Sequence, residues 1–456
     1  MTPQPTLSLG AHAKATLALG LPLIGSHLAQ MMLHVTDTVM LGWYGVTELA
    51  SVVLGASMFF VVFILGSGFA QAVMPMVAQA LGRGEEAQVR RDARMGLWLS
   101  ILFGAVCYPV FWWAEPILLA LGQQPDVSLL AQDYLRIAGL GMIPALLVMT
   151  LKSYLSALER TQVVLWVTLA AVGLNVWLNW MLIFGNAGAP ELGVRGAAIA
   201  SVVVQAASFL GLAIYAHLVP GLRRFALFQR FWRPDWQAFG QVFRLGWPIG
   251  LTGLAEGSLF QASALMMGWI GTMELAAHGI ALEVTALAFM VHLGLSNAAT
   301  IRIGRAAGMN DARRLRDAAT VAMGLSFLFG LSMVVLFLTL PAPIVSLFLD
   351  NNDPQAAAII AFGTLLLALS ALFQMVDAAQ VMALGFLRGM RDTKVPMWLA
   401  SISYWVVGIP VSYLLAFPLG LGGAGLWLGL TVGLTVAAVL LMARFWRRVR
   451  AGRSAL

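Results

Sequence analysis

The chain has 456 residues, of which 60% are hydrophobic and only 10% are charged, with a formal net charge of +7. A soluble domain carries about 25% charged residues, so this composition excludes an ordinary water-soluble protein and indicates a membrane protein. The single cysteine, Cys107, excludes intrachain disulfides and any cysteine metal cluster.

Apolar stretches recur along the whole chain, and about 20 residues suffice for one helical crossing of a bilayer. These stretches must be helices because lipid offers no partners for open backbone groups. The short alternating segments of a membrane β-barrel are absent from the sequence. The sequence therefore predicts an all-α integral membrane protein. We expect twelve transmembrane helices, at about 16–41, 50–81, 94–120, 129–158, 163–184, 193–218, 243–270, 276–303, 316–345, 356–387, 395–418 and 423–444.

The first predicted helix is not a signal peptide, because it is too long, contains Asp37 and has no small-residue cleavage site after it. Basic residues gather in alternate connections, and of the 27 only Arg136 and Arg195 fall in the other set. Since basic loops stay in the cytoplasm, both termini are expected there. The same alternation supports an even number of spans and disfavours a nucleic-acid partner.

The first predicted helix occurs twice in the chain. Gly20 and Pro22 correspond to Gly246 and Pro248 at an offset of 226 residues. The stretch GWYGVTELA at 42–50 matches GWIGTMELA at 268–276 with six of nine positions identical. Later matches, such as Trp166 with Trp398, show the offset drifting to 232.

The chain is therefore expected to fold as two parallel six-helix repeats that face each other across a central cleft. The first bundle covers residues 1–218 and the second 243–456. Residues 219–242 form the longest connection and mix arginines with Phe and Trp residues, as suits a cytoplasmic interfacial linker.

Four acidic residues lie inside predicted spans: Asp37, Glu256, Glu283 and Asp377. An ionised acid at the centre of a membrane helix costs at least about 2.5 kcal/mol, so such residues face a water-filled cavity or a partner. No Lys or Arg is expected at mid-span to neutralise them. We therefore predict a site for a proton or a cation, and the alternative is a protonated acid that bonds a neighbouring carbonyl.

Amide side chains lie near these acids. Asn175 and Asn179 are four residues apart and share one helix face, so they either form a cluster with Asp37 or hold two helices together. Gln374 is expected to share the face of Asp377. Glu283 lies near the outer end of its span, and a structural pair with His278 also accounts for it.

No HExxH, GxSxG, P-loop or CxxC motif occurs, so the sequence predicts neither an enzyme nor a nucleotide-driven pump. An ion gradient is then the expected energy source, and no cofactor is expected.

The chain resembles the multidrug and toxic compound extrusion (MATE) family, and within it the NorM-like bacterial branch. The resemblance covers essentially the whole length, and three motifs carry it: PLIGSHLAQMMLHVTDTVMLG with Pro22 and Asp37, the span opening LGWPIG with Glu256, and QMVDAAQVMALGFLRGMRDT with Asp377. Another branch of the family keeps only the acid of the first half. Glu256 and Asp377 in the second half of this chain therefore favour the NorM-like branch.

The resemblance implies a secondary active antiporter that exports organic cations, such as dyes and fluoroquinolone-type drugs, in exchange for Na⁺ or H⁺ by alternating access. It implies that Glu256 and Asp377 form a cation site, with Na⁺ as one candidate ion, and that Asp37 with Asn175 forms a second. The expected location is the bacterial inner membrane, as a monomer surrounded by lipid. The alternative is a lipid-linked precursor flippase of the same superfamily. Such a protein handles anionic pyrophosphates and is expected to have arginines at the site, whereas the residues expected at mid-span here are acids. A membrane-embedded enzyme would need a catalytic constellation that is missing.

Overall fold

The structure is a computed structural model that describes residues 8–349 and 354–452. Helices make up nearly all of these residues, and no strand occurs among them. The chain divides into two compact units. The N-terminal unit comprises residues 25–251, and the C-terminal unit comprises the chain up to residue 24 together with residues from 252 onward. The predicted all-α fold is thereby confirmed.

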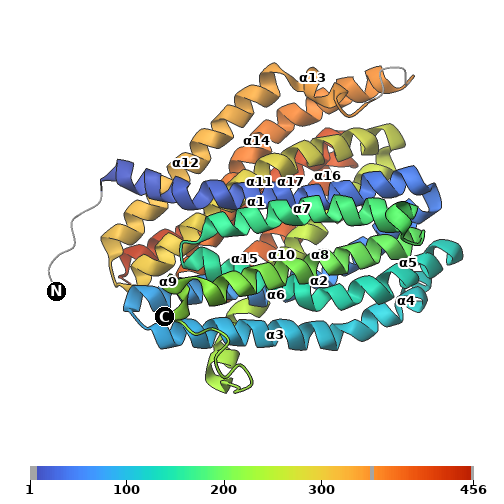
Figure 1. The fold of residues 1–456 in the computed structure, drawn as a ribbon. Helices are drawn as coiled ribbons and strands as arrows, with labels where there is room; N and C mark the ends of the chain where they lie inside the picture. Colours follow the sequence, from blue (N-terminus) through green and yellow to red (C-terminus); the bar gives the residue numbers. More distant parts are fainter. Residues whose placement is uncertain (1–7, 350–353, 453–456) are drawn as a thin grey trace. The chain divides into compact units, whose positions relative to one another are not determined.

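Two long helices each belong partly to both units, and Figure 1 shows their course by colour: α1 (Leu9–Tyr44) and α10 (Trp236–Ile270). The elements that lie wholly in the N-terminal unit are α2 (Val46–Arg83), α3 (Glu86–Trp112), α4 (Ala114–Ala120), α5 (Pro125–Ala138), the 3₁₀ turn η1 (Gly139–Gly141), α6 (Met142–Ala157), α7 (Thr161–Phe184), the 3₁₀ turn η2 (Asn186–Gly188), α8 (Gly193–Leu218) and α9 (Pro220–Arg223). Those of the C-terminal unit are α11 (Thr272–Gly308), α12 (Ala312–Thr339), α13 (Pro341–Ser346), α14 (Ala356–Gly389), α15 (Lys394–Ile402), the π-helical turn η3 (Ser403–Gly408), α16 (Ile409–Ala416) and α17 (Gly422–Arg450).

Eleven helical segments of the described chain are long and apolar enough to cross a membrane. Two of them are interrupted: α5, η1 and α6 form one segment, and α15, η3 and α16 form another. The remaining long helix, α10, has 35 residues but is not among the eleven. Glu256 and Gln261 lower its hydropathy. The eleven segments and α10 correspond to the twelve predicted helices.

The internal repeat is visible in the local structure. A short helix follows a long one in both halves, α4 after α3 and α13 after α12. The turn between α1 and α2 and the turn between α10 and α11 are also alike. At Gly45 and at Gly271, the space for a Cβ atom lies 2.1 Å from a carboxylate oxygen of the glutamate three residues later, Glu48 or Glu274. A larger residue at either glycine would displace that carboxylate.

Glycines let the first part of α10 pack closely on α2 in the N-terminal unit. A Cβ atom on Gly68 would lie 2.3 Å from the carbonyl oxygen of Gly246 and 2.4 Å from the nitrogen of Gly250. Such small residues allow two membrane helices to bring their backbones together. In the C-terminal unit the first part of α1 contacts α11 in the same way, since a Cβ atom on Gly294 would lie 2.8 Å from the nitrogen of Ile24.

Each compact unit thus contains the beginning of the first helix of the other sequence half. Gly246 and Gly294 lie 226 residues after Gly20 and Gly68, so the two close contacts are equivalent in the repeat. The sequence-based division, with bundles at 1–218 and 243–456, differs from this division by contacts. The difference arises because the chain passes from one unit to the other inside α1 and α10.

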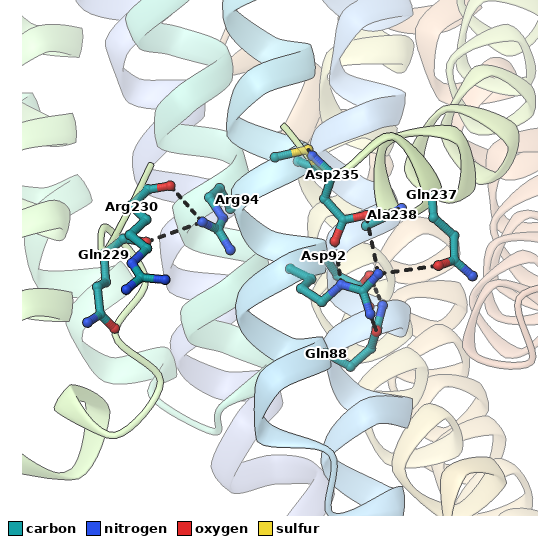
Figure 2. A network of polar contacts seen from close by, with 10 residues as sticks. Gln88, Asp92, Arg94, Gln229, Arg230, Asp235, Gln237 and Ala238 are labelled. Carbon is teal, nitrogen blue, oxygen red and sulfur yellow. Dashed lines mark hydrogen bonds and ion pairs between the residues drawn. The ribbon is translucent and has the colours of Figure 1, made fainter. Parts of the chain in front are cut away.

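The predicted linker, residues 219–242, lies in the N-terminal unit, and its last seven residues are the first residues of α10. Figure 2 shows how it is attached to α3. Arg94 donates hydrogen bonds to the carbonyl oxygens of Gln229 and Arg230, at 3.2 and 2.8 Å. Arg91 forms a two-point ion pair with Asp235. The linker therefore has fixed contacts with the protein, although Trp232 and Trp236 remain largely exposed.

Candidate functional site: two polar clusters within the helices

The C-terminal unit contains a group that we call the second-half cluster: Glu256, Asp377, Gln380 and Tyr404. Glu256 lies on α10, Asp377 and Gln380 lie one turn apart on α14, and Tyr404 lies in η3. The Gln380 amide nitrogen donates to the Tyr404 hydroxyl, and the Gln380 side chain also interacts with the Glu256 carboxylate. Glu256 and Asp377 are close enough to interact electrostatically. The fold thus brings together Glu256 and Asp377, the two acids expected to form a cation site.

Several oxygens of this region are buried without a hydrogen-bond partner among the described residues. They include Asp377 Oδ1 and Gln380 Oε1, and neither amide atom of Gln374 has a partner. A buried polar atom without a partner costs about 1–3 kcal/mol. Such atoms therefore favour binding of a group that satisfies them, and oxygen ligands of this kind suit hard cations.

The charges in the cluster favour the same conclusion. Two ionised carboxylates in one buried site repel each other, so a proton or a cation that binds between them relieves the repulsion. Arg388, in the last turn of α14, also interacts electrostatically with Glu256. Arg388 lies at the end of α14 and not at mid-span, so the expectation for mid-span positions is not contradicted, but a basic residue does interact with Glu256 from the end of the helix.

Contacts between α11 and α14 hold Asp377 in place. Ser296 donates to the carbonyl oxygen of Val381, at 2.8 Å, and Thr300 donates to that of Gly385, at 2.9 Å. Gly385 faces α11 so closely that a Cβ atom would lie 2.1 Å from Ser296 Oγ. These hydroxyl and glycine contacts fix the rotation of α14 just after Asp377 and so set the direction of the acid.

Tyr404 was not predicted from the sequence. It is fully buried and lies in the π-helical turn that interrupts the span Lys394–Ala416. Such turns inside helices are frequent at functional sites because they shift the register of the side chains that follow. The only sequence indication is a phenol within an apolar stretch, which does not by itself distinguish a site residue from a packing residue.

The N-terminal unit contains the first-half cluster, formed by Asp37, Asn175 and Asn179. Asn179 donates to Asp37 Oδ1 at 2.6 Å and Asn175 donates to the same oxygen at 3.1 Å. Both asparagines are buried, at 2% and 0% exposure, and Asp37 is half-buried. Of the two interpretations left open by the sequence, the structure shows the cluster with Asp37.

The remaining predicted residues are placed differently. Glu283 is exposed on α11 and forms no ion pair or hydrogen bond with any described residue. His278 is fully buried, accepts a hydrogen bond from Trp427 at 3.1 Å and lies 3.4 Å from Ser263 Oγ. The structure therefore does not show the alternative pairing of Glu283 with His278, and a place for Glu283 in a substrate or polar network stays a prediction.

Lys152 is another residue that the sequence placed with the cytoplasmic connections. It lies inside α6, five residues before the helix ends at Ala157. Its side chain lines a cavity of the N-terminal unit. Like Arg388, it shows that basic residues reach further into the helices than the pattern of loop charges indicated.

A comparison with protein families identifies the chain. The family model described as MatE matches residues 22–181 and again residues 248–414. The chain belongs to the MatE family. The two matches begin at Pro22 and Pro248, which are 226 residues apart, so one family unit occurs twice at the offset read from the sequence. The predicted duplication is confirmed.

Similar proteins cover nearly the whole chain. A protein of Rhizobium meliloti (strain 1021) named "Probable multidrug resistance protein NorM" is 49% identical over 442 residues, which cover 96% of this chain and 94% of the relative. A protein of the same name from Agrobacterium fabrum is 45% identical over 435 residues, with 95% and 94% covered. The chain is thus a NorM-like MATE transporter and not an enzyme.

Solved structures support the fold. A crystal structure of the eukaryotic MATE transporter AtDTX14 has a TM-score of 0.86 at 21% identity and covers 98% of this chain and 99% of that one. A crystal structure of MATE in complex with MaL6 has a TM-score of 0.88 at 20% identity, with 97% of both chains covered. At this identity the likeness shows that this transporter has the MATE fold.

Proposed function

We propose that this NorM-like transporter is a multidrug efflux antiporter that exports organic cations, such as dyes and fluoroquinolone-type drugs, in exchange for Na⁺ or H⁺. The observation that carries the proposal is the second-half cluster. The half-buried Glu256 and the buried Asp377 place two carboxylates in one region, beside amide and carboxylate oxygens that have no hydrogen-bond partner among the described residues. An organic cation and a coupling ion are both attracted to such a site.

The proposed mechanism is alternating access with competition for the carboxylates. When the site is open to the outside, Na⁺ or H⁺ binds at Glu256 and Asp377 and weakens the binding of the cationic drug, which leaves. When the site opens to the inside, the ion leaves and drug binds again. Each inward positive charge contributes about 2.3 kcal/mol per 100 mV of membrane potential, which can drive export against a concentration gradient.

Asp37 is proposed as a second, unequal ion- or proton-responsive residue. Its counterpart at the repeat offset is Ser263, and the counterpart of Glu256 is Gln30, so the two halves do not repeat their acids. Asn175 and Asn179 donate to Asp37 and so stabilise its ionised form. A proton or an ion that binds Asp37 would compete with these hydrogen bonds and change how α1 is held against α7.

The distribution of basic residues supports a bacterial inner-membrane location with both termini in the cytoplasm. A lipid-linked precursor flippase is the alternative within the superfamily. Lys152 and Arg388 weaken the argument that no basic residue lies within the helices, but the names of the relatives favour drug efflux.

The test is efflux of ethidium from proteoliposomes under an imposed Na⁺ gradient and, separately, under an imposed pH gradient. We expect one of the two gradients to drive efflux. Glu256→Gln and Asp377→Asn should each reduce the driven rate at least about tenfold, because each removes one charge from the cluster.

Glu85→Gln is the matched control, since Glu85 is an exposed acid just after α2 and forms a surface ion pair with Arg83. It should transport like the unmodified protein. Efflux that responds to neither gradient would contradict the antiporter proposal. Full transport by both charge-neutral variants would contradict the assignment of the cation site.

A further inference from the structure

The C-terminal unit contains an open groove between α14 and α17, with a volume of about 530 Å³. One wall is Ala379 of α14, and the other is the C-terminal part of α17. The side chains that line the groove are apolar as far as Trp446, and Arg447 and Arg450 lie at its end. Small-molecule sites have volumes of about 300–1,000 Å³, so the groove is large enough for a ligand.

The lining residues of α17 form one stripe along the helix. Val439, Met442, Trp446 and Arg450 follow one another at intervals of three or four residues, so they share a face. At 1.5 Å per residue, the rise from Val439 to Arg450 is about 16 Å. The hydrocarbon core of a bilayer is about 30 Å thick, so the groove has the length of one leaflet.

The arginines at the end of the groove differ from the two arginines beside them on the helix. Arg444 and Arg448 both pair with Asp392, at 2.7 Å, and so attach the end of α17 to the connection after α14. Arg447 and Arg450 are exposed, and neither forms an ion pair or hydrogen bond with any described residue. Two positive charges at the end of the groove are therefore available for an anion.

We propose that this groove binds one anionic phospholipid of the adjacent leaflet. An acyl chain lies along the apolar wall, and Arg447 and Arg450 bind the phosphate and the headgroup through charge-assisted hydrogen bonds. Basic pockets between membrane helices bind anionic headgroups in this way. Trp446 lies between the apolar and the basic parts, which suits a side chain at the level of the headgroups.

The unpaired charges favour an anionic lipid over a zwitterionic one, because a zwitterionic headgroup has no net charge to offset them. In the proposed topology the adjacent leaflet is the cytoplasmic one. The inference concerns a lipid ligand, and it does not depend on which compound is exported or which ion drives export.

Two lipids with the same acyl chains and different headgroups test this proposal. Phosphatidylglycerol is anionic and phosphatidylcholine is zwitterionic, and native mass spectrometry of the purified full-length protein measures how tightly each one binds. We expect the unmodified protein to bind one phosphatidylglycerol at least about tenfold more tightly than phosphatidylcholine. The double variant Arg447→Gln with Arg450→Gln should lose this preference, because both charges at the headgroup are removed.

A substitution in the apolar wall separates a groove from a charged surface. Arginines in a last helical turn also interact favourably with the helix dipole, an effect that needs no groove. Ala443→Trp places a large side chain in the groove and keeps both arginines, so it should weaken phosphatidylglycerol binding about tenfold. Ala361→Trp is the matched control, because Ala361 is an exposed alanine of α14 outside the groove, and it should leave binding unchanged.

Two further double variants examine the charges. Arg447→Lys with Arg450→Lys should keep the preference for phosphatidylglycerol, since the ammonium groups still attract the phosphate. Arg313→Gln with Arg316→Gln removes two exposed arginines that are also three residues apart, at the start of α12 and outside the groove. This control should leave the preference unchanged.

Equal binding of the two lipids by the unmodified protein would overturn the proposal. An equal loss of preference in the α12 control would overturn it in favour of general attraction to surface charge, and unchanged binding in Ala443→Trp would show that the groove is not the site. The midpoint of thermal unfolding in detergent checks that each variant is folded. If the glutamine variant of the groove proves unstable, Ala443→Trp and the lysine variant still decide the question. None of these outcomes bears on the proposed antiport.

Discussion

Single charged residues distinguish the parts of this transporter that are built alike. The same scaffold places Glu256 and Asp377 in one half and Gln30 and Ala145 in the other. The helices are therefore not enough to define a site, because equivalent positions hold acids in one unit and an amide and a methyl group in the other. Function at this scale depends on which residue has an opposite charge or a hydrogen-bond partner and which has none.

The ion pair between Arg91 and Asp235 leads to a prediction about pH. Hydrogen bonding from Arg91 lowers the pKa of Asp235 below its ordinary value of 3.8. The folded protein therefore favours the ionised carboxylate, and the stabilisation is present above pH 3.8 and is lost as the pH falls through the lowered pKa. Asp235→Asn should cost about 1 kcal/mol of local stability, so the linker amides should exchange with deuterium about fivefold faster.

Because the lowered pKa lies below 3.8, the difference between Asp235→Asn and the unmodified protein should be the same at pH 7 and at pH 5.5. Asp133→Asn is the control, since Asp133 pairs with Arg195 at 2.8 Å outside the linker. That substitution should leave exchange of the linker amides unchanged. A difference that disappears between pH 7 and pH 5.5 would contradict the role assigned to the Asp235 carboxylate.

Pairs of helices are held together by small residues that admit no side chain. The crossing of α2 with α10 depends on Gly68, whose missing Cβ atom leaves room for the backbone at Gly246 and Gly250. The equivalent crossing in the C-terminal unit uses Gly294 against Ile24. Backbone atoms cannot move aside as a flexible side chain can, so these positions should tolerate substitution poorly.

Gly68→Ala should therefore destabilise the protein by about 1–3 kcal/mol, as expected for overpacking at a close backbone contact. The measurement is the midpoint of thermal unfolding of the purified protein in detergent. Gly240→Ala, within α10, is the matched control because no atom lies within 4 Å of its Cβ position. It should be neutral or stabilise by up to about 1 kcal/mol. Equal midpoints for the two variants would show that the crossing is looser than the structure indicates.

At the level of the whole molecule, the compact units differ from the sequence halves. Residues up to 24 belong to the unit that contains the second half, and residues 236–251 belong to the unit that contains most of the first half. The first unit therefore needs the beginning of α10 to cover α2. This exchange links the two halves through continuous helices rather than through a flexible connection alone.

Two fragments of equal length test this division. Residues 25–251 form one compact unit, whereas residues 9–235 follow the sequence half and lack the part of α10 that covers α2. Expressed in membranes, the fragment 25–251 should be the more resistant to added protease, because the surface around Gly68 is covered. The amounts of intact fragment remaining over time give the comparison. Equal resistance, or greater resistance of 9–235, would contradict the exchange.

The sequence by itself determined the class of the molecule. Low charge, repeated apolar stretches and alternating basic loops require a helical membrane protein, because lipid permits no unpaired backbone. The repeat read from Pro22 and Pro248 coincides with the two matches to the family. Acids such as Glu256 and Asp377 were also recognisable as candidate site residues, because an ionised side chain inside a span is energetically costly and therefore indicates a functional site.

Only the tertiary structure decided which of these residues meet. Spacing along a helix cannot show that Gln380 links Glu256 to Tyr404, because the partners are contributed by separate segments of the chain. Glu283 and Asp37 look alike in sequence, yet Glu283 is exposed and Asp37 is held by two asparagines. The pattern of loop charges groups Lys152 with a cytoplasmic connection. In the structure it lies inside α6, and five helices pack so that its side chain lines a cavity. The physical reason is that contacts between distant segments depend on helix rotation, and close glycine and hydroxyl contacts set that rotation.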